Sequence, residues 1–194
     1  MPLDARVEGG SDRHVLVVQR GTCKLYELFA AERSGSGWNA DSGAVFDLRS
    51  NRLRPAGWTS ADAAGLPIFP GLARADEADG GAIHHALRFT VRRTQRAYVD
   101  PARHFASSDT NPDLPPMGLR FRLRSDYDVS GFHGQALAIL RALRSYGMFV
   151  ADNGSNWYVS GAPDPRWDDD DLDQLKRVPG SAFEVVRPGP LHKG

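Results

Sequence analysis

The sequence predicts a mainly β, α+β fold, either an antiparallel two-sheet sandwich or a barrel, with one long amphipathic helix packed against it. Three observations lead to this prediction. Short β-branched or alternating segments recur along the chain between glycine and proline residues. Only one stretch, 134–146, repeats its apolar residues with the period of a long helix. The length of 194 residues fits one domain, so we expect residues 1–194 to form a single β-rich domain.

The expected strands differ in pattern. Residues 14–19 and 24–29 are apolar runs on either side of Gly21, which indicates a hairpin. Residues 83–92 and 119–124 alternate between apolar and polar side chains, as half-buried strands do. Further strands are expected at 43–48, 97–99, 148–151, 157–159 and 182–186. Loops or irregular chain are expected at 33–38 and, as an ordered segment rich in proline and glycine, at 51–72, and the tail 188–194 is expected to be frayed.

The long helix is predicted at residues 134–146. Apolar residues between positions 136 and 143 fall at i, i+3, i+4 and i+7, which places them on one helix face. Gly147 is suited to end this helix in the left-handed conformation, and Ser130 is expected to cap its start. A short C-terminal helix is predicted at 167–177, where a run of aspartates would lie at the positive end of the helix dipole.

Composition argues against several classes of protein. Lys+Arg and Asp+Glu balance at 24 each, whereas a dedicated nucleic-acid binder is usually basic. Cys23 is the single cysteine, so no internal disulfide forms, and no apolar run is long enough for a membrane span. The motifs of serine hydrolases, nucleotide-binding proteins and zinc proteases are absent. We expect a monomer without a nucleic-acid partner, a membrane span or a cofactor.

Six residues are candidates for acid–base catalysis. By alternation, one histidine lies on the apolar face of the strand 83–92, where an imidazole needs a partner or a cavity. Semi-buried carboxylates, such as one that directly follows an apolar strand, are suited to glycoside hydrolysis. The candidates are His85, Asp152, Asp12, His14, His104 and Glu27. The alternative for each is a structural hydrogen bond or ion pair.

A metal site is the weaker hypothesis for the histidines. Neither His-x-His nor Cys-x-x-Cys spacing occurs in the chain. The possible ligands of such a site would be His85, His104 and one carboxylate.

Arginine and tryptophan residues are the candidates for substrate binding. Five arginines lie on the polar faces of two predicted strands, and if these strands pair, the guanidinium groups share one sheet face suited to an anionic ligand such as an acidic glycan. They are Arg88, Arg92, Arg120, Arg122 and Arg124. The alternative is a solvated face neutralised by Asp and Glu. Trp58 and Trp157 lie beside turns and could stack on sugar rings, or they could belong to the core.

Four runs of residues carry a resemblance to a known family. They are Glu8–His14, Arg54–Pro67, His85–Thr90 and Ala151–Ser155. These runs resemble a family of uncharacterised secreted bacterial proteins over nearly the whole chain. The resemblance implies a secreted, extracellular protein, some of whose relatives are joined to carbohydrate-associated modules. It also implies a further N-terminal segment, which this chain lacks, and a polysaccharide ligand.

These features together predict a secreted carbohydrate-active protein that cleaves a polysaccharide by carboxylate or histidine acid–base chemistry. His85 or Asp152 would be the acid–base group, and Arg88 would hold an anionic group of the substrate. The alternative is a non-catalytic domain that binds a glycan or cell wall through its tryptophans and arginines. A purely structural envelope protein is a third possibility.

Overall fold

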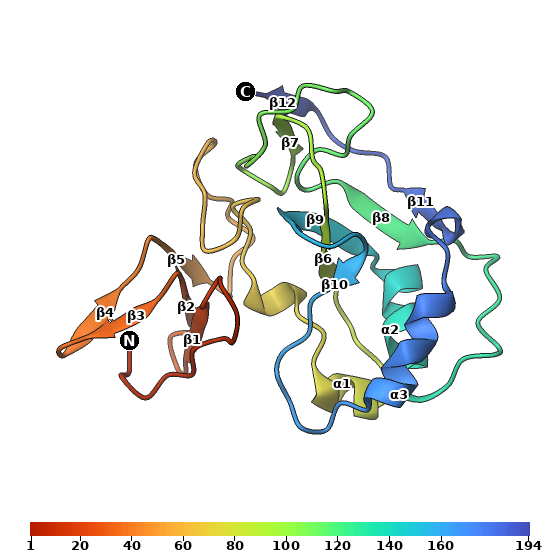
Figure 1. The fold of residues 1–194 in the computed structure, drawn as a ribbon, viewed down its shortest axis with the longest axis horizontal. Helices are drawn as coiled ribbons and strands as arrows, with labels where there is room; N and C mark the ends of the chain where they lie inside the picture. The colour runs from red at the N-terminus through yellow and green to blue at the C-terminus, as the bar shows by residue number, and fades with distance from the viewer.

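The chain consists of two main sheets connected by a long irregular segment (Figure 1). The computed structural model describes all 194 residues, Met1–Gly194. More residues lie in strands than in helices, so the fold is mainly β. The strand order of each sheet ends in two edge strands that do not pair with each other, so no sheet closes into a barrel. No helix has both the length and the apolar character that crossing a membrane requires.

The N-terminal sheet has the strand order β1-β2-β5 and is antiparallel throughout. Its strands are β1 (Val15–Gln19), β2 (Lys24–Phe29) and β5 (Ser42–Asp47). The predicted hairpin of the first two strands is confirmed, with Val15 opposite Leu28. The prediction of a loop at 33–38 is wrong, because β3 (Glu32–Ser34) and β4 (Gly37–Asn39) form a small hairpin there.

The larger sheet has the order β10-β6-β9-β8-β11. Its strands are β6 (Leu87–Val91), β8 (Arg120–Leu123), β9 (Met148–Asn153), β10 (Tyr158–Val159) and β11 (Phe183–Val185). The prediction of purely antiparallel pairing is wrong, because β6 and β9 run parallel. Parallel strands need a long crossover, and here the chain passes through β7, β8 and helix α2 before it returns.

Helix α2 (Gly134–Ser145) coincides with the predicted helix and covers one face of the larger sheet (Figure 1). Ile139, Leu140 and Leu143 of this helix join Leu87, Phe89 and other strand residues in a core of 20 buried residues. Gly147 follows the helix with φ of 75°, as predicted. The remaining helical turns are α1 (Ala75–Asp79), α3 (Asp169–Leu172), and the 3-10 turns Phe69–Gly71, Asp173–Arg177 and Gly180–Ala182.

The start of α2 is capped by a residue from another helix. Asp171 of α3 accepts hydrogen bonds from the backbone N–H groups of Gln135 (2.5 Å) and Ala136 (3.2 Å). The prediction that Ser130 caps this helix is wrong, because the N-cap position is His133 and it makes no side-chain cap. A carboxylate near the first turn satisfies free N–H donors and favours the helix dipole.

Replacing Asp171 with alanine is therefore expected to lower the free energy of unfolding by about 1–2 kcal/mol, the usual cost of losing a helix cap. Urea denaturation followed by circular dichroism measures this change. Asp170→Ala is the matched control. This substitution also removes one negative charge, but from an exposed residue that does not contact the start of α2. Equal destabilisation by the two variants would contradict the capping role.

The C-terminal residues are paired in a strand. β12 (Leu191–Lys193) runs antiparallel to β7 (Ala97–Val99), and the ring of His192 stacks on Tyr98 with their centroids 4.7 Å apart. The prediction of a frayed tail is wrong, because β7, about 90 residues earlier in the sequence, supplies the hydrogen-bond partners of β12.

The seam segment, residues 48–74, connects the two main sheets, and part of it lies between them (Figure 1). Its backbone and side chains are anchored on both sides: Ser42 Oγ donates to Ser60 O (2.5 Å), and Ala64 N donates to Ala151 O (3.1 Å). A sandwich of two sheets packed face to face is not confirmed, because this segment occupies the space where the sheets would meet. The arrangement brings polar residues of both sheets to one region.

Candidate functional site

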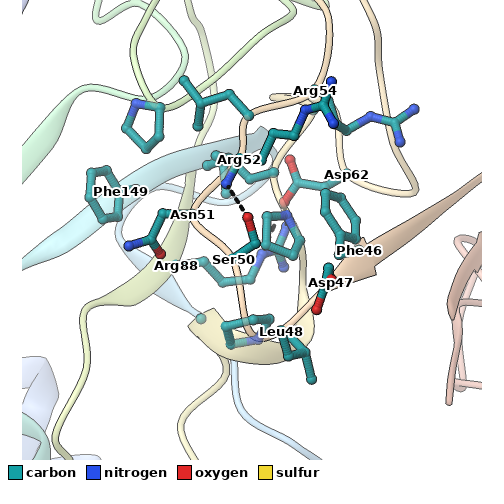
Figure 2. Close-up of a pocket in the computed structure, with 18 of the residues that line it drawn as sticks. Phe46, Asp47, Leu48, Ser50, Asn51, Arg52, Arg54, Asp62, Arg88 and Phe149 are labelled. Carbon is teal, nitrogen blue, oxygen red and sulfur yellow. Dashed lines mark hydrogen bonds and ion pairs between the residues drawn. The ribbon is translucent and has the colours of Figure 1, made fainter. Parts of the chain in front are cut away.

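A cleft of about 870 Å³ opens at the seam between the two sheets (Figure 2). β5 contributes Phe46, the seam segment contributes Arg52, Arg54 and Trp58, and β9 contributes Phe149. The cleft faces the side of the larger sheet that α2 does not cover. It is therefore a space in which side chains from both sheets can meet a ligand.

The floor of the cleft is a buried ion pair. Arg88 donates from Nε (3.2 Å) and Nη2 (2.9 Å) to one oxygen of Asp62, and from Nη1 to Ser160 Oγ (2.9 Å). The Asp62 side chain is fully buried, and that of Arg88 is 11% exposed. Burial raises the pKa of Asp62 to about 6, although Arg88 lowers it, and the charge of Asp152 raises it further. The pair therefore holds the seam segment to the larger sheet.

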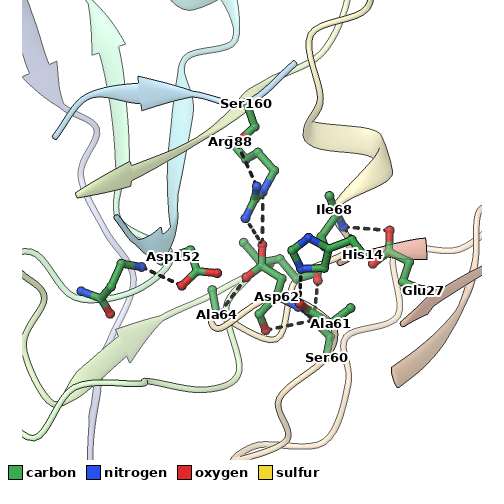
Figure 3. A network of polar contacts seen from close by, with 12 residues as sticks. His14, Glu27, Ser60, Ala61, Asp62, Ala64, Ile68, Arg88, Asp152 and Ser160 are labelled. Atoms are coloured by element: carbon green, nitrogen blue, oxygen red, sulfur yellow. Dashed lines mark hydrogen bonds and ion pairs between the residues drawn. The ribbon is translucent and has the colours of Figure 1, made fainter. Parts of the chain in front are cut away.

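Three of the predicted catalytic residues contact one short part of the seam segment, residues 61–69. The Nε2 atom of His14 lies 3.0 Å from Ala61 O, and the Nδ1 atom of His104 lies 2.9 Å from Ala63 O. Glu27 accepts hydrogen bonds from Ile68 N and Phe69 N, each at 2.9 Å. In Figure 3, Asp62 lies between Asp152 on one side and His14 and Glu27 on the other.

His14 is held as a structural cation. Its Nδ1 lies 2.5 Å from Glu8 Oε2 while its Nε2 faces a carbonyl oxygen, so both ring nitrogens must donate to satisfy both contacts. Burial alone would lower the pKa of His14, but the hydrogen bond and charge of Glu8 outweigh it and the pKa is raised. No ring nitrogen is left free to act as a base.

Glu27 is sealed inside the N-terminal sheet. Its side chain is fully buried, and burial raises its pKa to about 7 even though Ile68 and Phe69 donate hydrogen bonds that lower it. Because no face of this carboxyl group reaches solvent, its contacts favour the structural alternative stated for it above.

Asp152 differs from these buried groups because it is only partly buried and makes no ion pair. A β-bulge places it: Phe89 pairs with Val150 and Thr90 with Asp152, which leaves Ala151 without a partner. Burial raises the pKa of Asp152, and the nearby charge of Asp12 also raises it, while hydrogen bonds from Asn153 and Ala63 and the charge of Arg88 lower it. Ala151 lines the cleft directly beside it.

His85 lies apart from the other candidates. Its Nε2 is 3.1 Å from Glu77 Oε2 and its Nδ1 is 2.9 Å from Ala86 O, outside the cleft. The predicted strand 83–92 begins only at Leu87, where β9 starts to pair with it, so alternation does not fix the side of His85. No group of three or more His, Cys, Asp or Glu side chains lies close enough to hold a metal ion.

The arginine face is not a free cationic surface. The expected pairing of the two arginine-bearing strands, β6 and β8, is wrong, because β9 lies between them. Arg120 donates from Nε to Tyr146 O (2.7 Å), and Arg122 and Arg124 pair with Glu184 and Asp126. The expectation that Arg88 holds a substrate anion conflicts with its bidentate bond to Asp62, since most of its donors face protein atoms.

The two candidate tryptophans lie in different surroundings. Trp58 lines the cleft and is 58% exposed. Trp157 packs against Phe89 and Phe183, with ring centroids 5.5 and 5.1 Å away, on the face of the sheet that α2 covers. Trp58 is therefore available to a ligand in the cleft, whereas Trp157, although 41% exposed, lies outside the cleft and stacks on neighbouring aromatic rings.

No family model, curated protein or solved structure matches the chain. The resemblance stated above thus stays a prediction, and function is inferred from the side chains at the seam.

Sequence reasoning missed three residues at this site: Asp62, Arg52 and Arg54. Asp62 carries a usable signal, because a lone carboxylate among Ala61, Ala63 and Ala64 is a charge in a run of small apolar residues. Such a charge is buried only when it is paired. The two arginines stand in a polar irregular stretch and carry no comparable pattern.

Proposed function

We propose that the chain is a secreted carbohydrate-active protein that cleaves a polysaccharide or cell-wall glycan, with Asp152 as the acid–base group. The observation that carries this proposal is the state of Asp152: a partly buried carboxyl group with a raised pKa and no ion pair, beside the cleft wall formed by Ala151. A catalytic acid needs a pKa raised toward the working pH, so that it still holds its proton there.

The cleft suits a glycan in size and lining. Its volume of about 870 Å³ lies in the range of small-molecule sites, and the exposed ring of Trp58 offers an apolar face on which a sugar ring can stack. Ser50 and Asn51 add neutral hydrogen-bonding groups for sugar hydroxyls. One or a few sugar units would fill this space.

Asp12 is the proposed second carboxylate. It is exposed, and its charge acts on the pKa of Asp152. Hydrolysis of a glycosidic bond uses two carboxyl groups. Asp152 would give its proton to the glycosidic oxygen as the C–O bond breaks, and Asp12 would accept a proton from the water that attacks the sugar carbon. Arg88 and Asp62 would act as positioning residues that fix the seam segment.

A glycan-binding domain without catalysis is the second candidate. It is favoured by one specific observation: none of the six predicted acid–base residues lines the cleft itself. Asp62 and Arg88, which do line it, are bonded to each other. This candidate predicts that a glycan binds and is not cleaved.

Replacing Asp152 with asparagine is expected to reduce cleavage by about 100-fold or more, the usual contribution of a general acid, while the fold and glycan binding remain. Product release from a polysaccharide panel, measured by reducing-end assay, tests this. Because Asp152 must be protonated, the activity of the wild type should fall as the pH rises through the raised pKa of this residue.

His85→Ala is the matched control, since both ring nitrogens of His85 contact protein atoms, Glu77 Oε2 and Ala86 O, and its replacement should cause little loss of turnover. Undiminished cleavage by the Asp152→Asn protein would show that Asp152 is not the acid–base group. Binding without product release by the wild type would leave the glycan-binding domain as the function.

A further inference from the structure

The walls of the cleft carry an excess of positive charge. Four cations line it, Lys24, Arg52, Arg54 and Arg88, against two carboxylates, Asp47 and Asp62. Lys24 pairs with Asp47 at 2.9 Å, and Arg88 pairs with Asp62 at 2.9 Å. Arg52 and Arg54 have no ion-pair partner in the protein. Two guanidinium groups without an ion-pair partner therefore line a concave surface, which focuses their field on the space inside.

Arg54 is held firmly in this wall. Its guanidinium carbon lies 5.6 Å from the ring centroid of Phe46 and 5.6 Å from that of Trp58, and Nη2 donates to Thr59 O at 2.7 Å. Its Nε is shielded from solvent and has no hydrogen-bond partner. Aromatic rings and a carbonyl fix the position of a cation without supplying a counter-ion. Arg54 is thus preorganised for an anion that the chain itself does not provide.

Arg52 lies two residues earlier on the same stretch of the seam segment. Its side chain is exposed, and only its backbone N–H is hydrogen-bonded, to Ser50 Oγ at 3.1 Å. Figure 2 shows Arg52, Arg54 and Asn51 around the cleft, with Phe149 on the facing strand. One fixed and one exposed guanidinium group, with the exposed ring of Trp58 against the first, can bind a charged group and a sugar ring together.

We propose that Arg52 and Arg54 bind the anionic substituent of an acidic glycan while Trp58 stacks on the sugar ring that carries it. The chemistry is that of a carboxylate, as in a uronic acid unit, or of a phosphate in the backbone of a phosphoglycan; guanidinium groups match both. This inference rests on the proposed use of the cleft for glycans and does not depend on cleavage. It also relocates the anion site to the seam, away from the arginine face, where Arg88, Arg120, Arg122 and Arg124 are held by protein partners.

The test is isothermal titration calorimetry of the full chain carrying Asp152→Asn, which prevents turnover. The probes are oligogalacturonate, its methyl ester and a glycerol-phosphate oligomer. The acid is expected to bind about 10-fold or more tightly than its ester, and Arg52→Gln and Arg54→Gln are each expected to weaken it by about 10-fold or more, as the loss of a charge-assisted hydrogen bond does. Higher salt should weaken binding further.

Arg20→Gln is the matched control, because it removes the same charge from an exposed position outside the cleft and should leave the affinity unchanged. Arg54→Lys tests the fork geometry in a variant that keeps the charge. Tighter binding of the glycerol-phosphate oligomer than of the acid supports the anion site and assigns phosphate to it.

Equal affinity for the acid, its ester and the glycerol-phosphate oligomer would overturn the inference. Unchanged affinity in both glutamine variants, or no binding of either anionic probe, would also overturn it. Its failure is separable from that of the proposed function. Cleavage of a neutral glycan with no effect of Arg52→Gln leaves only the proposed function standing. Binding of an acidic glycan that the wild type does not cleave leaves only the anion site.

Discussion

Replacing Arg88 with methionine is expected to destabilise the folded chain by about 3–5 kcal/mol, the range found when one partner of a buried ion pair is removed. Asp62 would then be a fully buried carboxylate whose two bonds from Arg88 are gone. Its remaining bond from Ala64 N (2.7 Å) does not replace a counter-charge. Urea denaturation at neutral pH measures the loss.

The pH dependence of this loss identifies its cause. Without Arg88, the pKa of Asp62 should rise above its present value of about 6. Protonation of Asp62 then removes the cost of burying an unpaired negative charge. The variant should therefore be less destabilised at mildly acidic pH than at pH above neutrality. The double variant Asp62→Asn with Arg88→Met should recover much of the stability, because no buried charge is left. A loss that is independent of pH, with no recovery in the double variant, would contradict a dominant role for the ion pair.

Strands with a clear local pattern could be predicted from the sequence. In β8 and the β1–β2 hairpin, the alternation or the apolar run lies within a few residues of the turn that ends it. Helix α2 is similar, because its apolar period and Gly147 are local features. These elements are determined by residues close together in the chain, so a short stretch of sequence is enough to predict them.

The surroundings of Arg88 could not be predicted in this way. Alternation correctly assigns Arg88 to the face opposite the core, but it says nothing about what covers that face. The seam segment covers it: a Cβ atom added at Gly71 would lie 3.1 Å from Cβ of Arg88. A polar side chain that sequence alone places in solvent is therefore buried and paired with Asp62, 26 residues earlier in the chain.

The positions of His85 and Asp152 fail to follow from pattern for a second reason. β6 begins at Leu87 because its partner β9 begins at Met148, and Asp152 is directed by a bulge at Ala151. Both features are properties of strand pairing across about 60 residues, which no local window contains. Which of the candidate residues lie close together is thus decided by contacts distant in sequence.

Replacing Glu27 with glutamine is expected to remove a large part of the pH dependence of stability. The pKa of Glu27 is about 7 in the folded chain against an ordinary value of 4.5, so between these values the folded state keeps a proton that the unfolded state has lost. Stability therefore falls as the pH rises from about 4.5 to about 7, by roughly 3 kcal/mol in total. Glutamine has nearly the same shape and does not ionise.

The measurement is the free energy of unfolding of the wild type and of Glu27→Gln across this pH range. The two curves should lie close together in acid and separate as the pH rises, with the variant the more stable above pH 7 by about 3 kcal/mol. The exposed residue Glu32 supplies the control variant Glu32→Gln. A constant difference between the two curves would mean that Glu27 is ionised in the folded state throughout the range.

The difference between the curves isolates Glu27 because other groups shift stability in the same direction. Asp62 and Asp152 have raised pKa values, as does His14, so each stabilises the fold less as the pH rises. These four groups are all attached to the seam segment or lie beside it. Alkaline pH should accordingly loosen the contact between the two sheets first, and with it the cleft in which a glycan would bind.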